Sequence, residues 1–204
     1  MIGAIAFDWG GIFTEGTFDS DAVRNLARLC AVPEESVAKT YFPLMAHFEA
    51  GEFDMAEFVT RFRKESGLYF DEERFRETFL SSGRERTQMY DLLAGIPDAY
   101  RVGMLSNNVP LLCDRVRSDP RMARVETFLF SNELGVRKPD PAAYRKLQEA
   151  LELPPSQIVF IDDSEVNVSA CRRLGFAGIH FRSFDGLLGE LNRLAPDICP
   201  KVDG

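Results

Sequence analysis

Three short apolar runs of the chain each end in side chains that can bind a cation or an anion: Asp8, Ser106 with Asn107, and Asp162 with Asp163. Taken singly, such residues have ordinary roles as helix caps and turn formers. Two adjacent carboxylates, however, repel each other unless a cation lies beside them. A loop that contains Lys138 and opens a helix adds a positive charge to the set. Together these residues predict one active site.

The apolar runs before these side chains have the character of buried parallel strands. Residues 2–7 show no polar alternation, which is typical of a central strand covered on both faces. Four further runs are similar: 101–106, 127–131, 157–162 and 178–181. Stretches with helical periodicity alternate with them: 111–116, 141–151, 166–174 and 185–194. This alternation predicts an α/β fold with an open, doubly wound parallel sheet, in which ligands bind beyond the carboxyl ends of the strands.

The chain between the first two predicted strands has a purely helical pattern. Apolar spacing and start and stop signals bound four helices: 19–30, 33–50, 54–66 and 71–82. Phenylalanines at helical spacing predict a separate apolar core for them: Phe42, Phe48, Phe58, Phe62, Phe75 and Phe79. We expect a small all-helical cap over 16–85, inserted after the first strand of a core formed by 1–15 and 86–204. His47 and Glu49, at the end of the second helix, face either the cleft or solvent.

Length, charge and cysteine content limit the class of protein. A chain of 204 residues holds one packed core with a small insert. The formal net charge of -8 repels nucleic acid and anionic membranes, so neither is expected as a partner. Residues 1–9 lack the positive region of a signal peptide, which predicts a cytoplasmic protein. No zinc site of the usual spacing can be formed, and free thiols are expected at Cys30, Cys113, Cys171 and Cys199.

Four motifs occur in order along the chain: Phe7-Asp8-Trp9-Gly10-Gly11-Ile12, Met104-Leu105-Ser106-Asn107, Val136-Arg137-Lys138-Pro139-Asp140-Pro141 and Phe160-Ile161-Asp162-Asp163-Ser164-Glu165-Val166-Asn167. Through these motifs and their spacing, the chain resembles the haloacid dehalogenase superfamily, with its Rossmann-like core, over essentially its whole length. The helical insert is similar to the small cap of a subgroup. That subgroup includes sugar-phosphate phosphatases, the amino-terminal phosphatase domains of epoxide hydrolases, and haloacid dehalogenases.

The resemblance assigns Asp8 as a covalent nucleophile that forms an aspartyl phosphate, which divides hydrolysis into two easier steps. An anionic nucleophile meets a dianionic phosphate only with the help of a hard cation, and Mg²⁺ with oxygen ligands suits this task. The family pattern gives the ligands as Asp8, the backbone carbonyl of Gly10, Asp163, and Asp162 either directly or through a water.

The same pattern assigns the groups that bind the substrate. Ser106 and Asn107, the latter through its backbone amide and side chain, hydrogen-bond the phosphoryl oxygens, and Gly10 lies beside them. Lys138 neutralises the charge on the phosphoryl oxygens and on Asp8. The expected partner is a small phosphate ester, most simply a sugar phosphate, bound by a monomer or homodimer.

One position departs from the family pattern. Most phosphatases of the superfamily carry a second aspartate two residues after the nucleophile, where this chain has Gly10. A general acid–base contribution of about 10²–10⁴ in rate is therefore missing from its usual place. Catalysis persists if the leaving group departs easily, as from a sugar 1-phosphate, or if another residue such as Glu15 supplies the proton.

Two other functions stay open beside a Mg²⁺-dependent phosphomonoesterase. A 2-haloacid dehalogenase needs neither acid nor metal, because halide leaves as a stable anion, but the pair Asp162 and Asp163 beside an anionic nucleophile argues against it. The other is a non-catalytic module that binds a phosphate or a partner. The complete set of charge-neutralising residues argues against that reading.

Overall fold

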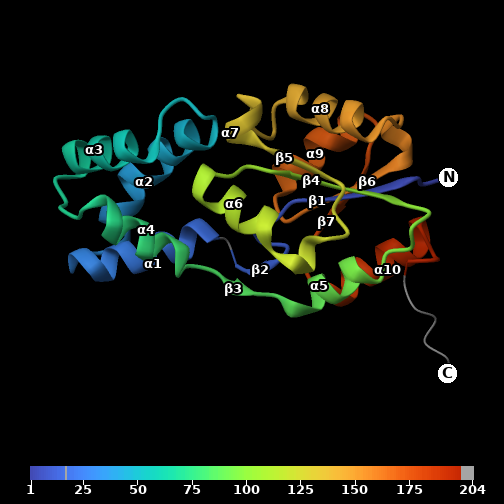
Figure 1. The fold of residues 1–204 in the computed structure, drawn as a ribbon, viewed down its shortest axis with the longest axis horizontal. Coiled ribbons are helices and arrows are strands. Elements are labelled where there is room, and N and C mark those ends of the chain that lie inside the picture. Colours follow the sequence, from blue (N-terminus) through green and yellow to red (C-terminus); the bar gives the residue numbers. More distant parts are fainter. Residues whose placement is uncertain (17, 199–204) are drawn as a thin grey trace.

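The candidate site residues lie at the carboxyl ends of the strands of a parallel sheet. The computed structural model describes residues 1–16 and 18–198. Its five-stranded sheet has the order β5–β4–β1–β6–β7, formed by Thr127–Phe130, Arg101–Ser106, Ala4–Phe7, Ile158–Asp162 and Ala177–His180 (Figure 1). All neighbouring pairs in this sheet are parallel. The predicted doubly wound α/β sheet is confirmed.

Helices cover both faces of the sheet. In Figure 1, α8 (Pro141–Leu151) and α9 (Glu165–Arg173) lie above it, and α5 (Thr87–Ala94) and α10 (Phe184–Leu194) lie below. Three shorter elements and one further helix connect the strands: α6 (Pro110–Ser118), α7 (Ser131–Leu134), and the 3₁₀ turns Pro120–Met122 and Pro155–Gln157. The sequence patterns anticipate α6, α8, α9 and α10 but neither α5 nor α7.

The strand β1 is buried on both faces. Ala4 and Ala6 pack in one apolar cluster with side chains of α8 and α9. Ile5 and Phe7 point the other way, into a larger cluster with side chains of α5, α6 and α10. Because neither face meets water, the strand needs no polar side chain until Asp8, which follows its last residue.

Four helices form a segment between β1 and β4, which we call the helical segment: α1 (Phe18–Cys30), α2 (Glu34–Glu49), α3 (Met55–Ser66) and α4 (Glu72–Leu80). They lie at the left of Figure 1, beyond the end of the sheet. The chain enters and leaves this segment through a short antiparallel pair, β2 (Thr14–Glu15) and β3 (Arg84–Glu85). The boundaries 16–85 for a cap stay a prediction.

Phenylalanine rings pack within the helical segment. The ring of Phe58 lies 5.0 Å from that of Phe75, which stacks on Phe79 at 5.5 Å. Phe48 and Phe62 are also fully buried, as expected. The expectation for Phe42 is wrong, because its side chain is 47% exposed. The neighbouring Tyr41 takes the inward position on α2 instead, with its ring 5.5 Å from that of Phe42.

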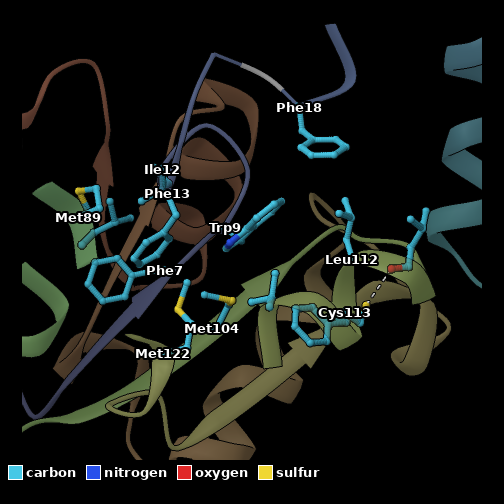
Figure 2. Close-up of a cluster of buried hydrophobic side chains, with 14 of the residues drawn as sticks. Phe7, Trp9, Ile12, Phe13, Phe18, Met89, Met104, Leu112, Cys113 and Met122 are labelled. Atoms are coloured by element: carbon cyan, nitrogen blue, oxygen red, sulfur yellow. Dashed lines mark hydrogen bonds between the residues drawn. The ribbon is translucent and has the colours of Figure 1, made fainter. Parts of the chain in front are cut away.

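The loop after β1 is anchored in the apolar core (Figure 2). The ring of Phe13 lies 5.7 Å from that of Phe7, and the ring of Trp9 lies 5.8 Å from that of Phe18 in α1. The neighbours of Asp8 on both sides, Phe7 and Trp9, are therefore fixed by packing. This arrangement restricts the backbone on which Asp8 stands.

The cysteines of the described residues are free thiols, as expected: Cys30, Cys113 and Cys171. Cys199 lies outside the described residues. The thiol of Cys113 donates a hydrogen bond to Oδ1 of Asn132 at 3.0 Å. Among the described helices, none combines the length and the apolar character needed to cross a membrane.

Candidate active site

Strand pairing brings three carboxylates together at the carboxyl edge of the sheet. Phe7 of β1 pairs with Ile161 of β6, so Asp8 lies next to Asp162, and the amide of Asp8 donates to the carbonyl of Ile161 at 2.8 Å. One carboxylate oxygen from each of Asp8, Asp162 and Asp163 lies within 4.8 Å of the others. The sequence prediction that these side chains meet is therefore correct in its geometry.

Lys138 lies between two of these carboxylates. Its Nζ is 3.0 Å from Oδ2 of Asp8 and 2.6 Å from Oδ2 of Asp162, and its side chain is fully buried. Burial alone would lower the pKa of Lys138, but the charges of Asp162 and Asp8 raise it above its ordinary value. The lysine is thus a buried cation, and not the solvated loop residue that an isolated Lys before Pro usually is.

The Asn107 side chain holds the backbone of Lys138. The amide of Lys138 donates to Oδ1 of Asn107 at 2.8 Å, and Nδ2 of Asn107 donates to the carbonyl of Lys138 at 3.0 Å. This two-bond clamp fixes the loop on which the ammonium group stands. The backbone amide of Asn107 and the buried hydroxyl of Ser106 at the end of β4 lie at the same edge of the sheet.

Asp162 and Asp163 differ in how their oxygens are used. Both oxygens of Asp162 accept from Nδ2 of Asn167 at 3.1 Å, and its Oδ1 also accepts from the amide of Ser164 at 2.8 Å. With Lys138 at Oδ2, the Asp162 carboxylate is fully occupied. Within residues 1–16 and 18–198, the half-buried carboxylate of Asp163 accepts no hydrogen bond from another side chain. Asp163 is therefore the freer of the two to bind a metal.

Two glycines after Asp8 have different constraints. Gly11 has a φ of 70°, and a Cβ at this position would collide with the carboxylate of Asp163. Its amide donates to Oγ1 of Thr14 at 2.9 Å. Gly10 has no such restriction, because a Cβ there would meet nothing within 4 Å. The turn therefore requires glycine at Gly11 for the close approach of Asp163, but not at Gly10.

The charges of the cluster do not balance within the protein. Burial raises the pKa of Asp8 to about 7, with Asp162 and Asp163 adding to the shift and Lys138 opposing it. Burial and the charge of Asp162 also raise the pKa of Asp163. Three carboxylates thus face one ammonium group. A divalent cation with oxygen ligands would restore the balance, and the residues present fit such an ion.

A cavity of about 180 Å³ lies above the cluster. Its floor includes Asp8, Gly10 and Asp163, and its roof comes from the helical segment, through residues of α1, α2 and α4: Phe18, Asp19, Met45, Glu49 and Phe79. The helical segment therefore closes the site from the side opposite the sheet. A cavity covered from this side limits the access of water to the reacting groups.

The cavity wall also holds polar groups that the sequence motifs do not assign. Glu49 is buried, and its Oε2 accepts from Nη2 of Arg137 at 2.6 Å. Asp19 accepts from the hydroxyl of Tyr41 at 2.8 Å. Among the described residues, Nδ2 of Asn108 and Nε of Arg137 are buried without a hydrogen-bond partner. Arg137 lies within the third motif and Asn108 directly follows the second, which is the one sequence signal that could have pointed to these two residues.

Two of the three polar residues considered from sequence near the ends of the segment and of α2 lie in solvent: Glu15 and His47. Glu15 of β2 is exposed, pairs with Arg84 at 3.2 Å and does not line the cavity. His47 is exposed and lies 2.8 Å from Glu52. Of the pair His47 and Glu49, only Glu49 faces the cleft.

Comparison with known proteins gives one family. The family model for haloacid dehalogenase-like hydrolases matches residues 2–175. A flavin mononucleotide hydrolase of Arabidopsis thaliana is 26% identical over 84% of this chain and 71% of its own length. A D-ribitol-5-phosphate phosphatase of Bacteroides thetaiotaomicron is 24% identical over 86% of this chain and 90% of its own.

The fold agrees with the sequence comparison. A haloacid dehalogenase family enzyme of Bacteroides thetaiotaomicron, crystallised with magnesium and inorganic phosphate, superposes with a TM-score of 0.76 at 21% identity. The match covers 92% of this chain and 99% of that one. The helical segment and the sheet are thus both included in the similarity.

Proposed function

The chain belongs to the haloacid dehalogenase-like hydrolases, and from this membership we propose that it is a Mg²⁺-dependent phosphatase that hydrolyses a small phosphate ester through an aspartyl phosphate at Asp8. The observation that carries the proposal is the cluster of Asp8, Asp162 and Asp163 around the buried ammonium group of Lys138. A cluster of this composition attracts a divalent cation and, with it, a dianionic phosphate.

Asp8 is the proposed nucleophile. Its Oδ1 accepts from the amide of Trp9 at 2.7 Å and its Oδ2 contacts Lys138, so the carboxylate is held in one orientation. Attack by Asp8 on phosphorus forms the acyl phosphate and expels the alcohol. Attack by water on the same phosphorus then releases phosphate and restores the carboxylate.

Bound at this site, Mg²⁺ would supply Lewis-acid stabilisation of the phosphoryl oxygens. We assign Asp8, the carbonyl of Gly10 and Asp163 as its ligands, because Asp163 lines the cavity and lies within reach of Asp8. Asp162 acts through Lys138 and is a positioning residue, since donors from Lys138, Ser164 and Asn167 already occupy its oxygens. In this scheme Asp162 reaches the metal at most through a water.

Three groups are proposed to bind the phosphoryl oxygens: the hydroxyl of Ser106, the backbone amide of Asn107 and the ammonium group of Lys138. Preorganised donors of this kind stabilise charge that develops on the transferring group. The burial of Ser106 and Lys138 supports this role, because buried donors need no solvent rearrangement during the reaction.

The volume of the cavity supports a small substrate. About 180 Å³ is less than the roughly 300 Å³ at which pockets for drug-sized ligands begin. A phosphorylated sugar or polyol suits this volume better than a flavin nucleotide. The cytoplasmic location, the state as a monomer or homodimer, and the lack of nucleic-acid or membrane partners stay predictions.

One screen tests the proposal against both alternatives. Small phosphate esters and 2-haloacids are assayed with and without Mg²⁺, for the native protein and for Asp8→Asn. Phosphate release that needs both Mg²⁺ and Asp8 supports the phosphatase. Halide release without metal would replace it by a dehalogenase, and background rates for every substrate, unchanged in Asp8→Asn, would leave a binding module.

A further inference from the structure

The proposed reaction leaves one proton without a source. When an alkyl phosphate is cleaved, the departing alkoxide must be protonated, and a positioned acid contributes about 10²–10⁴ in rate. Gly10 has no side chain for this task. Among the described residues that line the cavity, Asp8 and Asp163 are assigned to nucleophile and metal, which leaves two acids: Asp19 and Glu49.

We propose that Glu49 of α2 is the general acid and base of the proposed phosphatase: it protonates the leaving oxygen and then takes a proton from the attacking water. The inference rests on the proposed function. It concerns a residue of the helical segment, whereas every other group of the reaction comes from the sheet or its loops.

The position of Glu49 fits this task. In an in-line displacement the leaving oxygen lies opposite the nucleophile. Asp8 is on the floor of the cavity, so the leaving oxygen points to the roof, where Glu49 lies with 10% of its side chain exposed. The adjoining chain is held close to the sheet layer, because Gly51 packs directly against the backbone of Asn132. The carboxyl group is thereby kept in the wall of the cavity that Asp8 also lines.

The surroundings of Glu49 favour a carboxyl group that keeps its proton near neutral pH. Burial, the charge of Asp19 on α1 and that of Asp8 directly after β1 raise the pKa of Glu49 to about 7, against the opposing effect of Arg137. Arg137 also orients the carboxyl group through its 2.6 Å contact and stabilises the carboxylate that forms after proton transfer. Tyr41, on the same helix, is engaged with Asp19.

Asp19 is the less suitable of the two acids. Burial raises the pKa of Asp19, while the hydrogen bond that its Oδ1 accepts from Tyr41 and the charge of Arg137 oppose this shift and favour the ionised form. An ionised Asp19 next to Glu49 is the arrangement that keeps the proton on Glu49. Asp19 is therefore a positioning residue that sets the protonation of Glu49.

The proton is conserved over the cycle. In the first step a bond forms between the Asp8 oxygen and phosphorus, the ester P–O bond breaks, and the proton of Glu49 moves to the alcohol. In the second step water oxygen bonds to phosphorus, the bond to Asp8 breaks, and a water proton returns to the Glu49 carboxylate. The net reaction consumes one water and needs no further reactant.

Glu49→Gln tests the assignment, because glutamine keeps the size and the acceptor for Arg137 but has no acidic proton. With an alkyl phosphate accepted by the native protein, we expect the rate to fall by about 10²–10⁴. With 4-nitrophenyl phosphate, whose leaving group departs without a proton, we expect the first equivalent of 4-nitrophenolate to be released as fast as by the native protein, which appears as a stoichiometric burst. Later turnovers should be slow, because hydrolysis of the aspartyl phosphate then lacks its base.

Two further variants make the test specific. Glu52→Gln is the matched control, since Glu52 is exposed near the same helix end and does not line this cavity; both rates should stay native. Gly10→Asp, which has open space for its Cβ, should restore part of the alkyl phosphate rate when added to Glu49→Gln. The decrease in native activity as pH rises through about 7 should be absent in Glu49→Gln and shifted to lower pH in Asp19→Asn.

An equal loss of the burst and of the alkyl phosphate rate in Glu49→Gln, without rescue by Gly10→Asp, would overturn the inference and assign Glu49 a structural role. A native protein that releases no 4-nitrophenolate in the presence of Mg²⁺ would instead overturn the proposed function. The assay of the native protein therefore separates a failure of the proposed function from a failure of the inference about Glu49.

Discussion

The ammonium group of Lys138 lies 2.6 Å from Oδ2 of Asp162, and neither side chain reaches solvent. A buried pair of this kind is costly to break, because removal of one partner leaves a charge without compensation. The pair also links the loop after α7 to the end of β6. Its first consequence is therefore for the stability of the fold, before any substrate binds.

Lys138→Met should lower the free energy of unfolding by about 3–5 kcal/mol at pH 7 without Mg²⁺, since Asp8 and Asp162 then lose their shared cation. Urea denaturation measures the change. The control Lys146→Met alters an exposed lysine of α8 and should stay within about 0.5 kcal/mol of native. If Lys138→Met were as stable as the native protein, the prediction would be contradicted: Asp8 and Asp162 would then not need the charge of Lys138 in the folded state.

Asp163→Asn and Asp162→Asn should fail in different ways. Asp163→Asn should keep the fold but weaken Mg²⁺ binding by about tenfold or more. Loss of a residue that only hydrogen-bonds a metal ligand already lowers metal affinity by about tenfold, and loss of a ligand should lower it at least as much. Asp162→Asn mainly lowers stability, because Lys138 loses its closer partner. Calorimetric Mg²⁺ titration together with thermal melting separates the two effects. Equal loss of Mg²⁺ affinity in both variants would contradict the assignment of Asp163 as the direct ligand.

Gly11→Ala should damage the metal site, and Gly10→Ala should not. At Gly11 the φ of 70° costs an alanine about 1–2 kcal/mol, and its methyl group would displace the carboxylate of Asp163. At Gly10 the methyl group enters open space. Melting temperature and Mg²⁺ affinity of the two variants check this. Similar affinities in both would show that Asp163 does not depend on its approach to Gly11.

Gly51→Ala tests the contact between the helical segment and the sheet layer. Gly51 and Gly67 both have positive φ, at 75° and 70°, so alanine at either position adds strain of about 1 kcal/mol. Only at Gly51 would the methyl group also meet the backbone of Asn132. We expect a larger loss of stability and a raised KM for Gly51→Ala alone. Equal effects in the two variants would rule out this contact as the cause.

Glu49 should make stability depend on pH. Its pKa is about 7 in the folded protein against an ordinary 4.5, so folding holds the proton more tightly than the unfolded chain does. Its contribution is full below about pH 4.5 and is lost as pH rises through about 7, by at most about 3 kcal/mol. Glu49→Gln should therefore lose less stability between about pH 5 and about pH 8.5 in urea denaturation. An identical loss in both proteins would contradict the raised pKa.

The strands β1, β4 and β6 and the residues that follow them were predictable because these strands are buried on both faces. A run such as Ile158–Asp162 has no polar alternation, and its sudden end at Asp162 marks the edge where ligands bind. The helical segment was equally clear, since α3 has both start and stop signals in Asp54 and Gly67. These signals are local in the sequence, so a single chain reveals them.

What the sequence did not reveal depends on contacts between distant segments. Glu49 and Arg137 are 88 residues apart, and nothing local distinguishes Glu49 from an exposed acid at a helix end. Helical spacing predicts Phe42 in the core, because spacing alone does not tell which of two adjacent aromatic residues points inward. Glu15 was considered as an acid from its closeness to Asp8 along the chain, yet β2 turns it to solvent.

The pairing of Thr14–Glu15 with Arg84–Glu85 has a consequence for how such proteins can diversify. Since the chain departs and returns through adjacent strands, a recombination event at this junction could exchange everything between them without shifting the register of the sheet. A lineage could thus acquire a new substrate preference in one genetic step. If Glu49 travels with the exchanged piece, the proton donor is inherited together with the substrate preference it serves.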